Sequence, residues 1–240
     1  MKKNLCAFLL LFLFCTNSYC QTIDQPYDYP IKPGDKEWAK FKTGEEMLKA
    51  CQIPDEILLR LSTKALTETC LNYPLFINYL AFNDERAGIS HTIDSFNGLK
   101  ELTNRKDGYK ELINLYEQLP ILPSKGSRFT YLNDKNISFK TDFIELIICD
   151  TRFIDKMNNS DLVKLKATVL KKYQGKLDND GTHSLYNVLR TLLLGAATVE
   201  KLNASNMQLR SANNDVADFI KNYNRPTKEQ LEKITEIICK

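Results

Sequence analysis

Residues 185–196, Leu-Tyr-Asn-Val-Leu-Arg-Thr-Leu-Leu-Leu-Gly-Ala, carry the most regular pattern in this 240-residue chain. Apolar side chains recur there every three or four residues, which places them on one face of an α-helix. A second run with the same spacing follows Ser160, whose hydroxyl is expected to cap its helix. The apolar positions of the two helices are Leu162, Leu165, Val169, Leu170 and Tyr173, and then Leu185, Val188, Leu189, Leu192, Leu193 and Ala196.

Shorter helices are expected on both sides of the 185–196 helix. Thr43 with Glu46, and Thr227 with Gln230, have the three-residue spacing of a capping box. Further helices are expected after Pro54 and Ser62, after a break at Pro74, and over residues 84–96, 98–105 and 107–118. Because no ladder of strand-like segments accompanies them, the sequence predicts an all-α fold, either an irregular multi-helix bundle or an array of short helices.

Composition divides the chain into five segments. Three prolines keep residues 21–35 from forming a helix, so this segment is expected to be extended. In residues 119–140, strand-like runs at 128–132 and 137–139 flank a polar turn. This pattern predicts a loop or a small hairpin. The segments are a signal peptide (1–20), an extended N-terminal arm (21–35), an N-terminal helical lobe (36–118), the loop or hairpin (119–140) and a C-terminal helical lobe (141–240), the two lobes being separate or one domain.

The start of the chain has the pattern of a secretory leader. Lys2 and Lys3 precede an apolar run, Leu5 to Phe14, that is too short to span a bilayer. Cleavage is expected before Gln21, which would deliver the mature chain to the periplasm, the outer membrane or the exterior. No later run is long and apolar enough to hold it in a membrane.

Cys15 and Cys20, at the end of the leader, raise the alternative of lipidation. Phe14 and Tyr19 argue against it, because a small residue normally precedes a lipidated cysteine.

Removing the leader takes away two lysines and no acids, leaving 31 basic against 30 acidic side chains. This balance gives no indication of nucleic acid as a partner. One helix is rich in lysine, and its lysines are interpreted as a solvated face: Lys164, Lys166, Lys171, Lys172 and Lys176.

Four cysteines remain after cleavage, in a compartment that normally oxidises thiols. Three connectivities are open, and we favour Cys51 with Cys70 and Cys149 with Cys239, the first pair lying in neighbouring predicted helices. The alternative is that each cysteine is a small buried apolar side chain.

The sequence contains no recognised motif for catalysis, metal binding or cofactor binding. The only histidines, His91 and His183, lie in no zinc-binding or nucleophile pattern. Residues 178–182, Asp-Asn-Asp-Gly-Thr, resemble part of a calcium loop but lack its spacing and closing glutamate, and are interpreted as a polar turn. We therefore assign no catalytic residue, metal ligand or cofactor.

The aromatic residues near the start of the mature chain are the best candidates for binding. Tyr27, Tyr29 and Trp38 surround the prolines of the arm. They would form either an exposed adhesive arm or a strap over the helical core, and we favour the strap.

Residues 29–118 contain a series of short sequence pieces in a fixed order. The pieces are Tyr29-Pro-Ile-Lys-Pro-Gly34, Glu37-Trp38, Glu45-Glu-Met-Leu48, Cys51-Gln-Ile-Pro54, Leu61-Ser-Thr63, Glu68-Thr-Cys-Leu-Asn-Tyr-Pro-Leu75, Phe96-Asn-Gly98 and Arg105-Lys-Asp107. Together they resemble an uncharacterised family of secreted helical proteins from gut-type Gram-negative bacteria. The resemblance implies an exported helical module and carries no activity, catalytic residue or ligand.

Export without a catalytic motif favours a non-enzymatic secreted or envelope-associated protein that binds another macromolecule. Two alternatives stay open. One is a hydrolase of cell-wall or host polymers that uses scattered carboxylates or a Cys149/His183 pair. The other is a purely structural envelope component.

Overall fold

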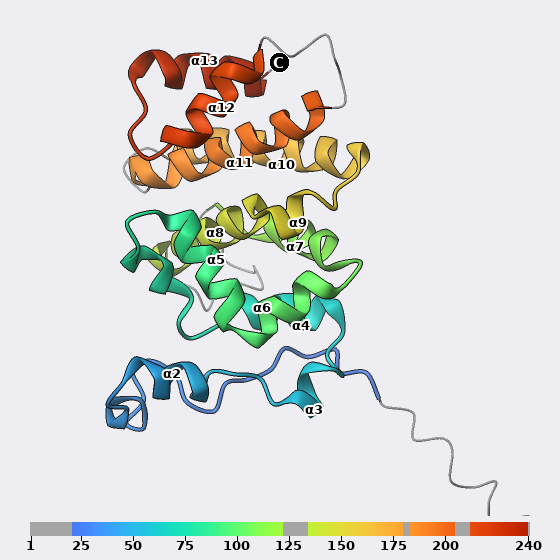
Figure 1. The fold of residues 1–240 in the computed structure, drawn as a ribbon, viewed down its shortest axis with the longest axis vertical. Helices are drawn as coiled ribbons and strands as arrows, with labels where there is room; N and C mark the ends of the chain where they lie inside the picture. The colour runs from blue at the N-terminus through green and yellow to red at the C-terminus, as the bar shows by residue number, and fades with distance from the viewer. Residues whose placement is uncertain (1–20, 122–133, 180–182, 205–211, 240) are drawn as a thin grey trace, which may run out of the picture.

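The computed structural model describes residues 21–121, 134–179, 183–204 and 212–239. Over these residues the protein is all-α, as the apolar periodicity predicts (Figure 1). The first half contains η1 (Trp38–Lys40), α2 (Gly44–Ala50), α3 (Asp55–Leu58), α4 (Thr63–Leu71), η2 (Phe76–Ala81), α5 (Glu85–Ser95), α6 (Asn97–Asn104) and α7 (Gly108–Gln118), where η marks a 3₁₀-helix. The second half contains α8 (Asp134–Cys149), α9 (Thr151–Ile154), α10 (Asn159–Asp178), α11 (Leu185–Ala204), α12 (Ala212–Asn222) and α13 (Lys228–Cys239).

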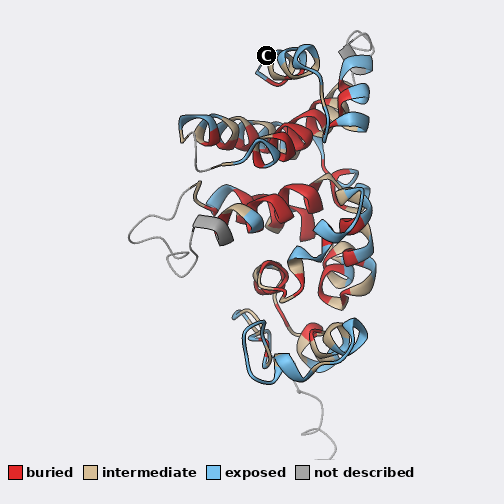
Figure 2. Ribbon diagram, turned by 90° about the vertical axis from the view of Figure 1, so that its left-hand side faces the viewer, coloured by how far each residue is buried: buried red, intermediate tan, exposed pale blue. Residues whose placement is uncertain are grey.

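The helices are stacked along the long axis of the molecule (Figure 1). The arm, α2 and α3 form one end, and α12 and α13 form the other. Helix α11 packs along α10 and also contacts α8, α12 and α13, so the segment with the most regular apolar pattern lies at the centre of the second half. Buried residues face one another across these layers (Figure 2), and one buried apolar cluster extends from Tyr29 to Ile238.

Local capping signals explain where several helices begin. The Thr43 hydroxyl accepts from the Glu46 backbone N–H at 3.2 Å at the start of α2. Thr227 and Gln230 form the predicted reciprocal pair ahead of α13, at 2.8 and 3.2 Å. The predicted Ser160 cap is wrong. Helix α10 begins at Asn159, two residues earlier than a Ser160 cap would place it, because Asn158 forms a capping box with Asp161.

The segment predicted as a loop or hairpin contains the start of α8. Residues 137–139 lie inside this helix, so their strand assignment is wrong. The physical reason is the spacing of the buried Ile137, Ile144 and Ile148 with Phe143, which fits a helix facing the core over four turns. Residues 128–132 lie outside the described residues, as do most of the polar turn at 178–182 and the whole leader with Cys15 and Cys20. None of the helices described could cross a membrane.

The four cysteines among the described residues, Cys51, Cys70, Cys149 and Cys239, are free thiols, so the preferred disulfides are not formed in this structure. Cys51 and Cys70 are both fully buried and pack as small apolar side chains. Helix α11 contacts both α8, which ends at Cys149, and α13, which ends at Cys239, and it lies between them (Figure 1). An intervening helix separates two chains by more than the roughly 7 Å between Cα atoms that a disulfide spans.

The lysine-rich helix α10 is not the uniformly solvated face that its sequence suggested. Lys172 and Lys176 are buried, which corrects that interpretation. The Lys176 ammonium lies 3.2 Å from both Glu145 carboxylate oxygens and donates to Thr191 Oγ1 at 2.7 Å and to the Asn187 carbonyl at 2.9 Å. A buried ammonium with this many acceptors is fully compensated.

Arg190 is a second buried cation. Together with Lys176 and the acidic side chains around both, it forms a group that we call the ionic cluster. Arg190 of α11 donates to Asp142 Oδ2 of α8 at 2.7 Å and to Glu85 Oε2 of α5 at 2.9 Å. Tyr223, directly after α12, donates to the same Glu85 oxygen at 3.1 Å. Burial raises the pKa of Asp142, and the charges of Lys176 and Arg190 oppose this rise. The cluster therefore ties helices from both halves of the chain together.

Candidate functional site

The N-terminal arm is bound to the helical core by its backbone. Ile23 pairs with the segment between α3 and α4: its N–H donates to the Arg60 carbonyl at 2.8 Å, and its carbonyl accepts from Ser62 N–H at 2.9 Å. Further along, the Tyr27 N–H donates to Thr69 Oγ1 at 2.9 Å. The prolines that prevent a helix here leave the arm extended, so it can follow the surface of α4.

A pocket of about 630 Å³ lies between this arm and the helices, and we call it the arm pocket. This volume is in the range of small-ligand sites in proteins. Three separate parts of the chain form it: the arm, the turn after α4 with the first residue of η2, and one side chain of α8. Its lining residues are Pro26, Tyr27, Asp28, Tyr29, Lys32, Pro33, Asn72, Tyr73, Pro74, Phe76 and Lys140.

Aromatic rings form the inner wall of the arm pocket. Tyr29 is buried, its hydroxyl donates to the Thr69 carbonyl at 3.3 Å, and its ring meets Tyr27 edge to face at 5.1 Å between centroids. Tyr73 stacks on Phe96 at 4.0 Å. Burial raises the pKa of both Tyr29 and Tyr73, so both hydroxyls stay protonated over the physiological range. The inner wall is thus uncharged and held in place by packing.

Lys140 is the buried charge of the arm pocket. It is only 7% exposed, although it lines the pocket. Its ammonium donates to Asn72 Oδ1 at 2.7 Å and lies 5.6 Å from the centre of the Phe76 ring. Burial lowers the pKa of Lys140 from 10.5 to about 8. At the mouth, Lys32 is half-exposed and forms an ion pair with Asp28.

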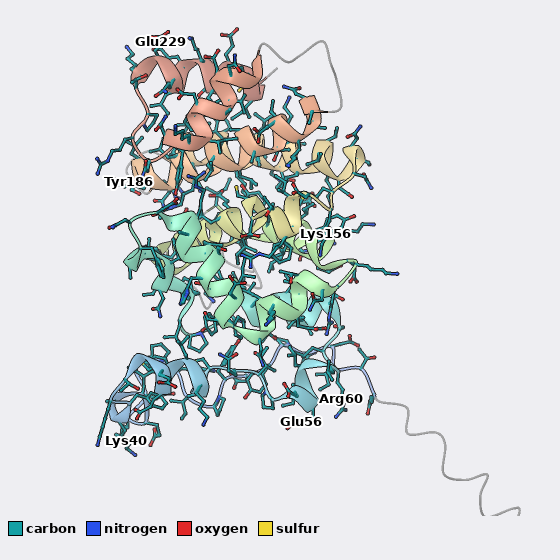
Figure 3. The ribbon with its side chains drawn as sticks, in the orientation of Figure 1. Lys40, Glu56, Arg60, Lys156, Tyr186 and Glu229 are labelled. Carbon is teal, nitrogen blue, oxygen red and sulfur yellow. The ribbon has the colours of Figure 1, made fainter. Side chains whose placement is uncertain are left out.

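The aromatic candidates from the sequence are divided by the structure. Tyr27 and Tyr29 both line the arm pocket, whereas Trp38 does not. Trp38 lies in η1 and packs edge to face on Phe41 at 5.6 Å. This 3₁₀-helix lies at an outer corner of the molecule, where Figure 3 labels Lys40.

Sequence reasoning missed the groups around the buried charge. Asn72 and Phe76 both follow α4, but Lys140 comes 68 positions after Asn72, so no local spacing joins the three residues. The one signal was Lys140 itself, a charged residue just before the apolar run of α8.

The groups considered for catalysis lie elsewhere. His91 packs beside the Phe82 ring, with 5.3 Å between ring centres. Cys149 is a free, half-buried thiol, and no hydrogen bond joins it to His183 among the described contacts. Asp142 and Glu145 are fully buried in the ionic cluster, out of reach of a polymer. Within the described ranges, no group of three His, Cys, Asp or Glu side chains could hold a metal.

The chain was compared with protein-family models, with curated proteins and with solved structures. No match was found in any of the three. The resemblance of residues 29–118 to a secreted helical family therefore stays a prediction, and the candidate site rests on the geometry of the arm pocket.

A second depression, of about 560 Å³, lies between α10, α11 and α13 at the other end of the molecule. Its walls are mainly leucine and valine, and Leu177 and Leu185 are exposed there. Tyr186, next to Leu185, points away from the molecule at the start of α11 (Figure 3). This groove has no buried charge that would select a ligand, so the arm pocket is the stronger candidate.

Proposed function

We propose that this chain is an exported, non-enzymatic protein that binds another macromolecule through the arm pocket. The leader pattern supports export to the periplasm, the outer membrane or the exterior, and the resemblance noted above agrees with it. The single observation that carries the binding proposal is the pocket itself. It joins a fixed aromatic wall to one buried ammonium, as expected of a ligand site with few, well-placed polar groups.

Exposed apolar side chains that are close in sequence to lining residues of the arm pocket support a macromolecular partner. Ile77 follows Phe76 directly and is 47% exposed, while Phe139 precedes Lys140 and is 38% exposed. Leu80 and Phe82, further along the same segment as Ile77, are also exposed. Large exposed apolar side chains are typical of a surface that a partner covers. A partner would thus place one group in the pocket and pack on exposed side chains of this kind.

Affinity capture from envelope extracts tests the proposal. The bait proteins are the mature wild type, Tyr27→Ala in the arm pocket, and Leu185→Ala in the distant groove as the matched control. Both substitutions remove a large, solvent-accessible side chain. We expect a partner that is retained by the wild type and Leu185→Ala and lost with Tyr27→Ala. Recovery of no partner, or equal recovery by all three baits, would contradict the proposal.

A further inference from the structure

We infer that the arm pocket binds a carboxylate of the partner, with the Lys140 ammonium and the Asn72 side-chain amide as its two donors. This inference rests on the proposed function and specifies the chemistry recognised at that site.

Lys140 is a buried cation without a counter-ion in the described part of the chain. An ammonium carries three N–H donors, and Asn72 Oδ1 is the one hydrogen-bond acceptor it meets there. Burial is the one cause of the shift in the pKa of Lys140, and no described carboxylate contributes to it. Lys176, equally buried, meets Glu145, Thr191 and a backbone carbonyl. Because a buried charge is unfavourable unless compensated, the contrast indicates that Lys140 is compensated by something that enters the pocket.

The donors at this point fit a carboxylate better than a more highly charged anion. Asn72 uses its oxygen to accept from Lys140, and no described residue accepts from its amide nitrogen. The ammonium and the amide nitrogen are therefore neighbouring donors, and a carboxylate has two oxygens to receive them. A phosphate dianion would need a second free cation, but Lys32 is half-exposed and already paired with Asp28.

The apolar residues that line the arm pocket indicate which chemical group of the ligand carries the carboxylate. Pro26, Tyr27, Tyr29, Pro33 and Phe76 present rings and apolar carbons to the pocket. Such walls favour an apolar or aromatic body next to the charged group. In a protein partner, this chemistry is found at a chain end with an apolar last residue, or at an acidic side chain among apolar neighbours.

The protonation of Lys140 gives the interaction a pH signature. Since burial lowers the pKa of Lys140 to about 8, the amine is mostly charged at pH 7 and mostly neutral about one pH unit above the pKa. We expect carboxylate affinity to fall above pH 8, approaching about tenfold per pH unit. A neutral ligand of the same shape should show no such change.

Three small probes test the inference on the mature protein by isothermal titration calorimetry, supported by chemical-shift mapping. N-acetylphenylalanine carries a terminal carboxylate, N-acetylphenylalanine amide is its neutral counterpart, and N-acetylaspartate N-methylamide carries only a side-chain carboxylate. We expect the wild type to prefer at least one acid over the amide by about tenfold or more at pH 7. Which acid is preferred distinguishes a chain end from an acidic side chain.

Lys140→Met should abolish this preference, while Lys164→Met, at an exposed lysine of α10, should keep it. Circular dichroism of both variants checks that the fold is intact. Equal binding of acid and amide by the wild type, a preference that survives in Lys140→Met, or binding of no probe would each overturn the inference. If a partner is still captured through Tyr27 in any of these cases, the proposed function stands and only the carboxylate chemistry fails.

Discussion

Replacing Lys140 with methionine is expected to stabilise the unliganded protein at neutral pH while removing its capacity to bind a carboxylate. In the unfolded chain the amine has its ordinary pKa of 10.5, and burial lowers the pKa to about 8 in the folded protein. Holding the proton in the folded state at pH 7 therefore costs about 3 kcal/mol. Methionine loses the hydrogen bond to Asn72 and the contact with Phe76, together about 1–2 kcal/mol. The net gain at pH 7 is about 1–2 kcal/mol.

The sign of the pH dependence follows from the same shift. Between about pH 8 and pH 10.5 the unfolded state binds more protons at this site than the folded state, so wild-type stability rises with pH in that window. The free-energy cost of keeping Lys140 protonated in the folded protein is fully present below pH 8. The advantage of Lys140→Met should therefore be largest near pH 7 and decrease by about 2 kcal/mol by pH 9.5.

Urea unfolding of the wild type and Lys140→Met at both pH values measures this difference. Lys164→Met is the matched control, because its ammonium is half-exposed beside Glu117 and should change stability by less than about 0.5 kcal/mol at either pH. A destabilised Lys140→Met at pH 7, or an advantage that does not change with pH, would refute the reasoning that Lys140 is buried without compensation.

Three further expectations concern the core. Glu145→Leu should destabilise by about 3–5 kcal/mol in urea unfolding, because it removes the closer carboxylate of the buried Lys176 ammonium and leaves only Asp142, at 3.7 Å, as its counter-ion, and adding Lys176→Met should restore part of the loss; a single-variant loss under about 1 kcal/mol would argue against a buried ion pair. Gly88→Ala should lower stability by about 1–3 kcal/mol, because its Cβ would lie 2.6 Å from a carbonyl oxygen of η2, and an unchanged melting temperature would show that α5 does not pack this closely. In the native protein, iodoacetamide should label the exposed Cys239 well before the fully buried Cys51, whose thiol pKa is raised by burial to about 11. Equal labelling rates by mass spectrometry, or no labelling of either thiol without reductant, would contradict that assignment.

The helical class and most helix positions could be predicted because they depend on local signals. The apolar faces of α10 and α11 and the caps at Thr43, Ser62 and Thr227 are properties of neighbouring residues. The start of α8 was missed because prolines and polar residues ahead of it suggested a loop. There the helical periodicity becomes clear only after residue 137.

The positions of the buried charged residues could have been predicted from the sequence. Lys172 and Lys176 continue the three- and four-residue spacing of the apolar face of α10, so their place in the core could have been predicted. Asp142 and Glu145 likewise interrupt the apolar run of α8, and Arg190 that of α11. Charges within apolar faces of three helices, with both signs present, predict that the helices meet and pair them. Which acid meets which base depends on tertiary packing that local spacing does not encode.

Only some residues of the arm pocket could be predicted from the sequence. Tyr27 and Tyr29 were identified because aromatic residues in a proline-rich arm are candidates for binding. Asn72 and Lys140 are separated by 68 positions and meet only because α4 and α8 pack together. A pocket built from three distant parts of the chain needs the fold before its chemistry can be recognised.

Site-specific photo-crosslinking in envelope extracts is the most direct test that the arm pocket is the binding site. Benzoylphenylalanine would replace Tyr27 in the pocket or, as a control, the exposed Val163 of α10. The account predicts a discrete crosslinked partner from position 27, absent from position 163 and reduced by an excess of whichever acid probe the protein prefers. A partner that crosslinks from position 163 and not from position 27 would contradict it.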